Sequence, residues 1–343
     1  MGGCDQAFGR EGRLKRLETR ETSMWRVSII VAAAFFALAV SAAEIYPNRP
    51  VRMLIPYPAG GGLDLPGRAV AQKFVDATGQ QMVIDNRGGA GGLIAGEIVA
   101  KASPDGYTLF LASNGQISIA PALYQKLPYD PLKDFEPITH LVDTPMVLFV
   151  NAQYPVQSVA ELIAAAKAKP GTIGCALSGV GGVSHLTLEL FKLRANVNLL
   201  PVPYRGAAIG LGDVAGGTVP AIFSTLAAAK PLLDGGRIRA LAVASPRRTG
   251  GLPNLPTFGE LGYSGMDAPL WIGLMAPKGT PAAIVSKLHG EFAKAMAAPD
   301  VKERLATQSA DIVAAGPREF ADMIKRDTAR WAEVVKVAKI KIE

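Results

Sequence analysis

Short apolar runs alternate with longer amphipathic stretches along nearly the whole chain. The first apolar runs, each of a length typical of a strand, span 51–55, 81–85 and 107–112. Helix-like stretches lie between them at 65–77 and 93–101. Alternating strands and helices are typical of a parallel sheet with helices on its faces. The pattern therefore predicts an α/β fold.

Prolines interrupt this rhythm between residues 121 and 137 and predict a long irregular segment. A strand is expected next at 146–150, followed by a helix at 159–169 that Pro170-Gly171 ends. The later strands are predicted at 173–177, 199–203, 219–223, 238–244, 270–276 and 311–314. The later helices are predicted at 184–194, 207–215, 225–234, 281–297, 300–308 and 317–337.

Residues 24–43 have the pattern of an export signal. Met24-Trp25-Arg26 precedes an uncharged apolar stretch, and the small residues Ser41-Ala42-Ala43 follow it. A positive start, an apolar stretch too short for a comfortable membrane span and a small-residue cleavage site indicate a secretory signal peptide. The mature protein is therefore expected in the periplasm, beginning near Glu44. The polar residues 1–23 fit no signal peptide, which favours Met24 as the true start.

The composition of the remaining roughly 300 residues limits the classes of function, and their length predicts two lobes. Basic residues exceed acidic ones, but they are scattered, so nucleic-acid binding is not expected. Cys175 loses its only possible partner when Cys4 leaves with the leader, and its apolar neighbours predict a buried thiol. Three widely separated histidines predict no zinc site, and the sequence indicates no cofactor.

Two glycine-rich loops, one in each half, each follow a strand-like run and begin a helix-like run. The first glycine loop is Tyr57-Pro58-Ala59-Gly60-Gly61-Gly62-Leu63-Asp64. The second glycine loop is Ser178-Gly179-Val180-Gly181-Gly182-Val183-Ser184-His185. The N–H groups at the start of a helix are unpaired, and the helix dipole favours negative charge there. Two such loops facing each other would hold a small anion, which indicates a carboxylate-binding protein rather than an enzyme.

Several other segments occur in a characteristic order along the chain. They are Asn86–Gly92, Ser103–Leu109, Leu127–Ile138, Val202–Gly206, Leu255–Phe258 and Trp271–Pro281. Together they resemble the solute receptors of tripartite tricarboxylate transporters, the Bug or TctC-like family. The resemblance implies a two-lobed type II periplasmic-binding-protein fold with a ligand cleft between the lobes. Lobe one would comprise 44–143 and 245–343, and lobe two 144–244. It also implies a monomer that delivers a small organic acid to a two-component membrane permease.

The expected ligand site joins the two glycine loops to the ends of neighbouring strands. Hydroxyl groups of Ser178 and Ser184 suit a carboxylate, whereas Asp64 is expected to cap its loop rather than touch the anion. His185 is left open between a ligand donor and a packed neutral ring. The full set is Tyr57, Pro58, Ala59, Gly60, Gly61, Asp64, Ser113, Asn114, Ser178, Gly179, Gly181, Gly182, Ser184, His185, Tyr204, Arg205 and Ser224.

Two members of this set bear on the chemistry of the ligand. Arg205 would bind a carboxylate in a bidentate manner, or would pair with Asp213 at the surface; the sequence leaves both open. Ser224 stands where the family often carries an aspartate that would pair with a ligand amino group. Its presence favours a mono- or dicarboxylate without an essential amino group.

Two alternatives of other classes remain. One is a secreted hydrolase or transferase with Ser178 or Cys175 as nucleophile and His185 as base. The absence of a G-x-S-x-G elbow argues against it. The other is a receptor that senses its ligand for a signalling partner instead of a permease.

Overall fold

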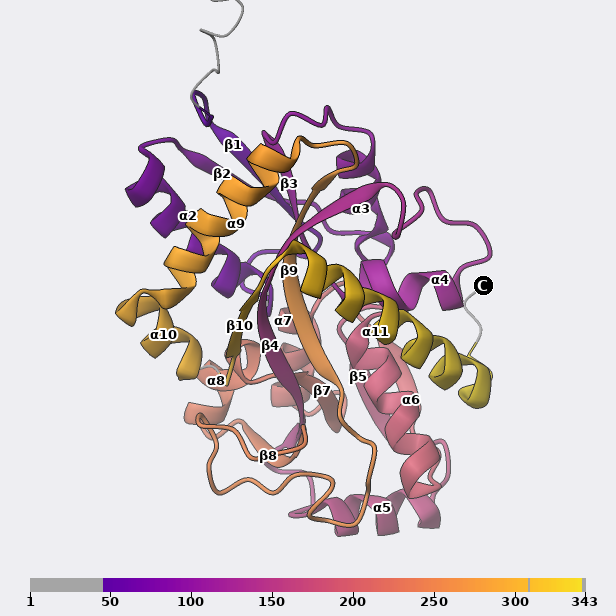
Figure 1. The fold of residues 1–343 in the computed structure, drawn as a ribbon. Coiled ribbons are helices and arrows are strands. Elements are labelled where there is room, and N and C mark those ends of the chain that lie inside the picture. Colours follow the sequence, from indigo (N-terminus) through magenta and orange to yellow (C-terminus); the bar gives the residue numbers. More distant parts are fainter. Residues whose placement is uncertain (1–45, 308, 341–343) are drawn as a thin grey trace, which may run out of the picture. The chain divides into compact units, whose positions relative to one another are not determined.

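The computed structural model describes residues 46–307 and 309–340 (Figure 1). The predicted signal peptide at 24–43 and the start at Glu44 lie outside the described residues. The chain divides into two units, Met1–Asn48 and Arg49–Glu343, and the fold given below is that of the second unit. Among the described residues, no helix combines the length and apolar character needed to cross a membrane.

The described residues form a ten-stranded sheet with the order β2-β1-β3-β9-β4-β7-β5-β6, in which β8 and β10 also pair with β4. The strands are β1 (Val51–Ile55), β2 (Met82–Asn86), β3 (Thr108–Ser113), β4 (Phe135–Asn151), β5 (Gly174–Leu177), β6 (Leu200–Pro203), β7 (Ala221–Thr225), β8 (Ile238–Ala244), β9 (Pro269–Pro277) and β10 (Asp311–Ala315). Pairing is parallel among β1, β2 and β3 and among β5, β6 and β7. It is antiparallel between β3 and β9 and everywhere along β4. The sheet is therefore mixed, and the prediction of a parallel sheet holds only toward its two ends.

Strand β4 belongs to both groups of strands. Its residues up to Pro145 pair with β9 and β10, and its residues from Met146 pair with β7 and β8. The sequence predicted only 146–150 as strand: residues 135–137 were wrongly assigned to the irregular segment, and 138–145 were assigned to no element. Pro137 misled the prediction: it lies where the register of the β4–β9 ladder shifts, and an irregular ladder tolerates a residue without an N–H group.

The helices lie close to their predicted ranges. They are α2 (Asp64–Thr78), α3 (Leu93–Ala100), α5 (Val159–Ala168), α6 (Val183–Ala195), α7 (Ala207–Gly216), α8 (Leu226–Asp234), α9 (Ala282–Ala297), α10 (Pro299–Ala306) and α11 (Pro317–Ala338). Local signals set several ends: Ser158 caps α5 by accepting from the Glu161 N–H, and Gly79 ends α2 in the left-handed conformation. Three short turns were not predicted: η1 (Ala90–Gly92), the π-helical turn η2 (Gly115–Ile119) and α4 (Ala120–Leu123).

Two hydrophobic clusters pack against the sheet. One joins β3, β9, η2 and α11 through side chains such as Phe110, Trp271 and Phe320, and the rings of Trp271 and Phe320 meet edge to face at 5.4 Å. A Cβ atom at Gly273 would lie 2.1 Å from the Phe320 ring, so only glycine fits under it. The other cluster joins β4 and β7 to α7 and α8. The lobe boundaries at 143 and 245 remain predictions.

Candidate functional site

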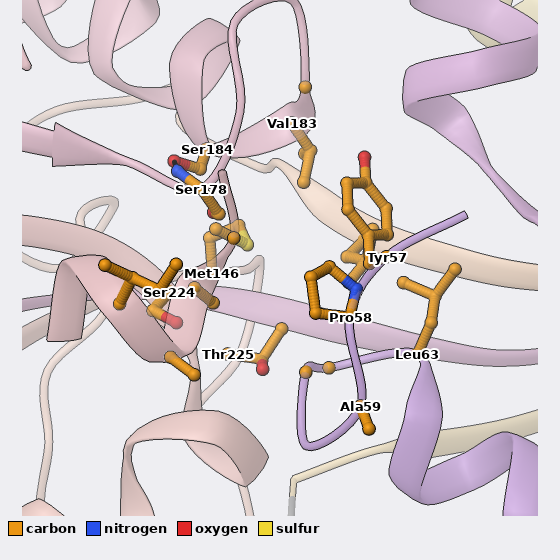
Figure 2. A pocket seen from close by; sticks show the side chains of 18 residues that line it. Tyr57, Pro58, Ala59, Leu63, Met146, Ser178, Val183, Ser184, Ser224 and Thr225 are labelled. Atoms are coloured by element: carbon orange, nitrogen blue, oxygen red, sulfur yellow. Dashed lines mark hydrogen bonds between the residues drawn. The ribbon is translucent and has the colours of Figure 1, made fainter. Parts of the chain in front are cut away.

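Four helices of the described residues, α2, α6, α7 and α8, begin around one pocket (Figure 2). The residue before each helix, which is Leu63, Gly182, Gly206 or Thr225, lines that pocket. The pocket encloses about 640 Å³ of empty space, part of it open to solvent. The first N–H groups of a helix lack an intrahelical partner, so four sets of donors surround one volume.

Side chains of the pocket wall are either apolar or carry a hydroxyl group. The hydroxyl groups are those of Tyr57, Ser178, Ser184, Ser224 and Thr225. The apolar side chains are those of Pro58, Ala59, Leu63, Met146, Val183, Ala207, Ala208, Ile209 and Leu270. Within the described part of the chain, no acidic, basic or histidine side chain lines this pocket. Its favourable potential for an anion therefore comes from backbone N–H groups and helix dipoles.

A buried carboxylate holds the first glycine loop in shape. Asp64 accepts hydrogen bonds from the Gly60 N–H at 2.9 Å, from Arg68 Nε at 2.9 Å and from Asn86 Nδ2 at 3.1 Å. Burial opposes ionisation of this carboxyl, but hydrogen bonds from Arg68, Gly60 and Asn86 outweigh burial and lower its pKa. Gly60 has a φ of +80°, a conformation that favours glycine. Asp64 itself does not line the pocket.

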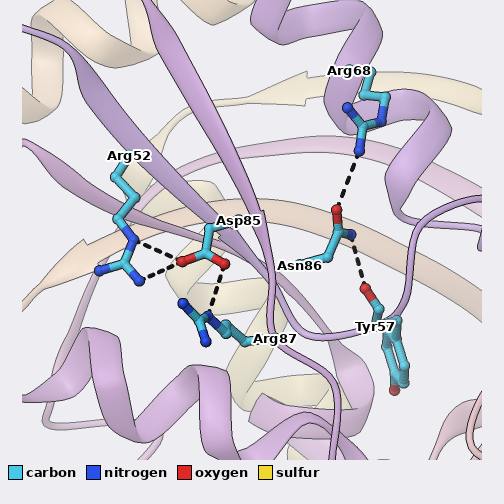
Figure 3. A network of polar contacts seen from close by, with 6 residues as sticks. All are labelled: Arg52, Tyr57, Arg68, Asp85, Asn86 and Arg87. Atoms are coloured by element: carbon cyan, nitrogen blue, oxygen red, sulfur yellow. Dashed lines mark hydrogen bonds and ion pairs between the residues drawn. The ribbon is translucent and has the colours of Figure 1, made fainter.

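The end of β2 supports the same loop through hydrogen bonds (Figure 3). Asn86 donates to the Tyr57 carbonyl at 2.9 Å and accepts from Arg68 at 3.2 Å. The preceding residue, Asp85, accepts from Arg52 and from Arg87, and hydrogen bonding by Arg52 is the main reason that its pKa is lowered. The position of the Tyr57 backbone is thus fixed by side chains that do not reach the pocket.

The second glycine loop uses part of its hydrogen-bonding capacity internally. Ser184 Oγ accepts from the Ser178 N–H at 3.0 Å, and His185 Nδ1 accepts from the Gly181 N–H at 3.2 Å. An accepting Nδ1 belongs to a neutral imidazole, and burial lowers the pKa of His185 accordingly. The Glu189 carboxylate is 3.9 Å from His185 Nε2, beyond hydrogen-bonding distance. His185 is therefore a buried neutral ring behind the pocket wall.

Residues of the first glycine loop approach the starts of α6, α7 and α8 closely. A Cβ atom at Gly62 would lie 2.9 Å from Thr225 Oγ1, and one at Gly206 would lie 3.5 Å from Pro58 Cδ. At Gly182 the nearest side-chain atom to such a Cβ is Tyr57 Oη, at 3.6 Å. The absence of side chains at these positions allows the chain segments to enclose the pocket.

The structure brings some of the predicted site residues together and separates others. Those that line the pocket are Tyr57, Pro58, Ala59, Gly61, Ser178, Gly182, Ser184 and Ser224. Gly179, Tyr204 and Arg205 line an adjoining hollow, which shares Tyr57, Pro58 and Ser178 with the pocket. Those that line neither are Gly60, Asp64, Ser113, Asn114, Gly181 and His185.

Ser113 and Asn114 turn into the protein. Ser113 Oγ donates to Gln116 Oε1 at 2.9 Å, and Asn114 Nδ2 donates to the Pro269 carbonyl at 2.9 Å. Near the hollow, Tyr204 donates to Asp213 at 2.6 Å, which raises the pKa of Tyr204 to about 12. Arg205 forms no ion pair with any described residue, so its pairing with Asp213 is not observed.

Sequence reasoning missed several pocket residues. Thr225 caps α8 by accepting from the Ala228 N–H, and a threonine between a strand and a helix is a signal that would have predicted this role. Gly206 precedes α7 in the same way. Met146 and Leu270 carry no such signal, because an apolar residue in a strand looks the same whether it faces the core or a pocket.

The side chains considered for nucleophilic catalysis are not arranged for it. Cys175 is fully buried in β5, and burial raises the pKa of its thiol to about 12. In the described part of the chain, no hydrogen bond joins His185 to Ser178 or to Cys175, and His185 Nδ1 is already occupied by the Gly181 N–H. Of these three residues, Ser178 alone lines the pocket.

Helix starts gathered around a pocket in an α/β fold are a common site for binding a small ligand. Residues 67–340 match the family described as tripartite tricarboxylate transporter family receptor, and the chain belongs to this family. It is 37% identical to Protein BugT of Bordetella pertussis over 318 residues, which cover 92% of this chain and 97% of BugT.

Solved structures agree with this assignment. The structure of "R. palustris Rpa4515 with adipate" is 36% identical, covers 86% of this chain and 99% of its own, and superposes with a TM-score of 0.84. The periplasmic binding protein BugD is 36% identical with a TM-score of 0.83, covering 87% of this chain and all of its own. The predicted family and the predicted fold class are both confirmed.

Proposed function

We propose that this protein is a periplasmic receptor that binds a small organic carboxylate and delivers it to a membrane permease. The observation that carries the proposal is the pocket itself: four helix starts surround it, and none of its described lining side chains is charged. Binding without turnover is the expected activity.

A carboxylate suits the electrostatics of the pocket. One helix N-terminus stabilises an anion by about 0.3–1 kcal/mol, and by up to about 2 kcal/mol when partly buried. A hydrogen bond to a charged group contributes about 1.5–3 kcal/mol, and Ser178, Ser224 and Thr225 add hydroxyl donors to the backbone N–H groups. A ligand amino group would meet no acidic partner among the described residues that line the pocket, which disfavours amino acids.

The rest of the ligand is expected to be largely apolar. Leu63, Met146, Ile209 and Leu270 contribute hydrocarbon surface to the pocket, and burying methylene groups against it is favourable by about 0.8 kcal/mol each. Carboxylates separated by a methylene chain fit this wall better than polyhydroxylated acids. Adipate, present in the structure of one relative, has this character.

Export of the protein and delivery of its ligand to a permease are proposed from the family and from the sequence. Family membership supports a transporter receptor, and the apolar stretch at 27–40 supports export. N-terminal sequencing of protein from the periplasmic fraction should give a start near Glu44. Uptake of labelled adipate by cells should fall when the gene is deleted, whereas an altered transcriptional response with unchanged uptake would favour the sensor alternative.

A thermal-shift panel followed by calorimetry tests the binding function. Succinate, glutarate, adipate and benzoate should raise the melting temperature, and amino acids and sugars should not. Gly61→Val should abolish binding, because Gly61 lines the pocket and the added side chain would occupy it. The fold should tolerate the change, since the atom nearest to a Cβ at this position is the Pro58 carbonyl oxygen at 3.4 Å. Gly250→Val, at an open position away from the pocket, is the matched control. Stabilisation by sugars or amino acids alone would contradict the proposal, as would full affinity in Gly61→Val.

A further inference from the structure

Gln116, a residue that no sequence motif singled out, lies buried in the π-helical turn η2 behind the pocket. All four hydrogen-bonding positions of its amide are occupied. Its Oε1 accepts from the Ser113 N–H at 3.2 Å and from Ser113 Oγ at 2.9 Å. Its Nε2 donates to Tyr57 Oη at 2.9 Å and to the Gly91 carbonyl at 2.8 Å. A single side chain thus joins η2 to the first glycine loop and to η1.

Two backbone groups fix the orientation of this amide. The Ser113 N–H can only donate and the Gly91 carbonyl can only accept, so Oε1 must face Ser113 and Nε2 must face Gly91. The second hydrogen on Nε2 then points at Tyr57 Oη. The Tyr57 hydroxyl must accept this bond, which leaves its own hydrogen available for donation.

The surrounding backbone is shaped to admit the amide. Gly92 has a φ of +94°, and a Cβ atom there would lie 2.5 Å from Gln116 Nε2. Any other residue at this position would push the amide away from Tyr57 and Gly91. Glycine at position 92 is therefore needed for the approach of the Gln116 side chain, and not only for the turn.

The Tyr57 hydroxyl lies close to Gly182, the residue before α6. Tyr57 lines the pocket, and its Oη is the nearest side-chain atom to a Cβ built on Gly182. Burial raises the pKa of Tyr57, so the phenol keeps its hydrogen at neutral pH. The hydroxyl of Ser113 and the amide of Gln116 partly oppose this rise in pKa. A carboxylate oxygen in the pocket would be a stronger acceptor for the Tyr57 hydrogen than a neutral hydroxyl.

We propose that Gln116 is a positioning residue for ligand recognition: by donating to Tyr57 it presents the Tyr57 hydroxyl to the ligand carboxylate as a donor. The role of Gln116 in ligand recognition rests on the proposed function. The hydrogen bond between Gln116 and Tyr57 does not depend on a ligand. Loss of this bond leaves the hydroxyl free to rotate away from the pocket. The affinity for a carboxylate then falls, although no pocket-lining atom has been removed.

A double-mutant cycle in adipate binding tests the proposal. Gln116→Met keeps the length of the side chain and removes its hydrogen bonds, and Tyr57→Phe removes the hydroxyl. Each is expected to weaken adipate binding about tenfold, the effect of one hydrogen bond to a charged group. The double variant should bind about as well as Tyr57→Phe alone. A purely structural role would instead give the same tenfold loss in both backgrounds, and that result would overturn the proposal.

A ligand-free measurement accompanies the cycle. In protein labelled at the tyrosine Cζ carbon, the Tyr57 resonance, assigned by its loss in Tyr57→Phe, should shift in Gln116→Met. The control Gln72→Met removes an exposed amide that, within the described part of the chain, donates to Asp76 alone, and it should leave the resonance unchanged. An unshifted resonance in Gln116→Met would contradict the hydrogen bond.

A second variant covers the case in which Gln116→Met does not fold. Gln116→Glu can still accept from Ser113, but its carboxylate would draw the Tyr57 hydrogen away from the ligand, so adipate should bind more than tenfold more weakly. Wild-type affinity in a folded Gln116→Glu protein would overturn the proposal. If no acid of the panel binds the wild type, the proposed function fails; if acids bind both proteins equally, only the role of Gln116 fails.

Discussion

Replacing Asp64 with asparagine would remove the negative charge that holds the first glycine loop, with almost no change in side-chain volume. Asp64 is only 3% exposed, and its two oxygens accept from the Gly60 N–H, Arg68 and Asn86. An asparagine has one accepting oxygen and an NH₂ group. In either orientation its NH₂ group faces a donor, on the Asn86 side or on the side of Gly60 and Arg68.

The cost follows from these partners. A hydrogen bond from the Gly60 N–H to a charged acceptor contributes about 1.5–3 kcal/mol. Arg68 is 46% exposed, so screening by solvent reduces its ion pair with Asp64 to less than about 1 kcal/mol. An acid in the first turn of α2 adds about 0.3–1 kcal/mol through the helix dipole. The expected loss for Asp64→Asn is therefore about 2–5 kcal/mol of unfolding free energy.

The loss should depend on pH in a defined direction. The pKa of Asp64 is lowered in the folded protein from its ordinary value of 3.8, so the carboxylate stabilises the fold above that value and loses this contribution as pH falls through the folded pKa. The difference between wild type and variant should be full at neutral pH. It should shrink once the pH is below 3.8.

Urea unfolding followed by circular dichroism, at pH 7 and again near the acid limit of folding, measures both effects. The matched control is Asp76→Asn on the same helix, because Asp76 is exposed and its one side-chain hydrogen bond among the described residues is from Gln72. The control should change the unfolding free energy by less than about 0.5 kcal/mol. Equal small effects of the two substitutions, or a difference that grows on acidification, would refute the reasoning.

Three further outcomes are expected. Cys175 should not react with a thiol reagent at pH 8 until the protein is unfolded, because it is fully buried and its pKa is raised to about 12; rapid labelling of native protein would contradict this. Affinity for adipate, measured by calorimetry, should change less than about twofold between pH 6.5 and 8.5. Among the described residues that line the pocket, Tyr57 is the one titratable side chain, and His185 behind the wall stays neutral. Trp271→Phe should lower the unfolding free energy by about 2–4 kcal/mol in urea, because the Asp327 carboxyl loses a 2.7 Å donor inside the protein; a cost below about 0.5 kcal/mol would show that Asp327 finds another partner.

Patterns local in sequence predicted most of the fold. Apolar runs located the strands, and caps and glycines located the helix ends to within a few residues, because these signals depend on the nearest turn of chain. The start of β4 was missed because a proline normally excludes a central strand, whereas the irregular register opposite β9 accommodates Pro137. The turn η2 was missed because a buried turn after a strand has no characteristic composition.

The parts of the candidate site that the backbone of a single loop forms were predicted from the sequence. The parts that depend on distant segments lying side by side were missed. The two glycine loops were identified because glycine before a helix has a local meaning. That Ser113 would turn inward could not be read from the sequence, because its partner Gln116 folds back through a π-helical turn. Which residues line the pocket depends on how distant strands are brought together, as with Met146 and Leu270.

Strand β4 also constrains the order in which the protein folds. All of its ladder partners, β7, β8, β9 and β10, follow it in the sequence, and the first of them begins only at Ala221. The centre of the sheet therefore depends on contacts of high sequence separation, which form slowly because long loops must close first. A chain cut before Pro269 would leave the first part of β4 without its β9 and β10 partners. The middle of this sheet is expected to be the last part of it to assemble.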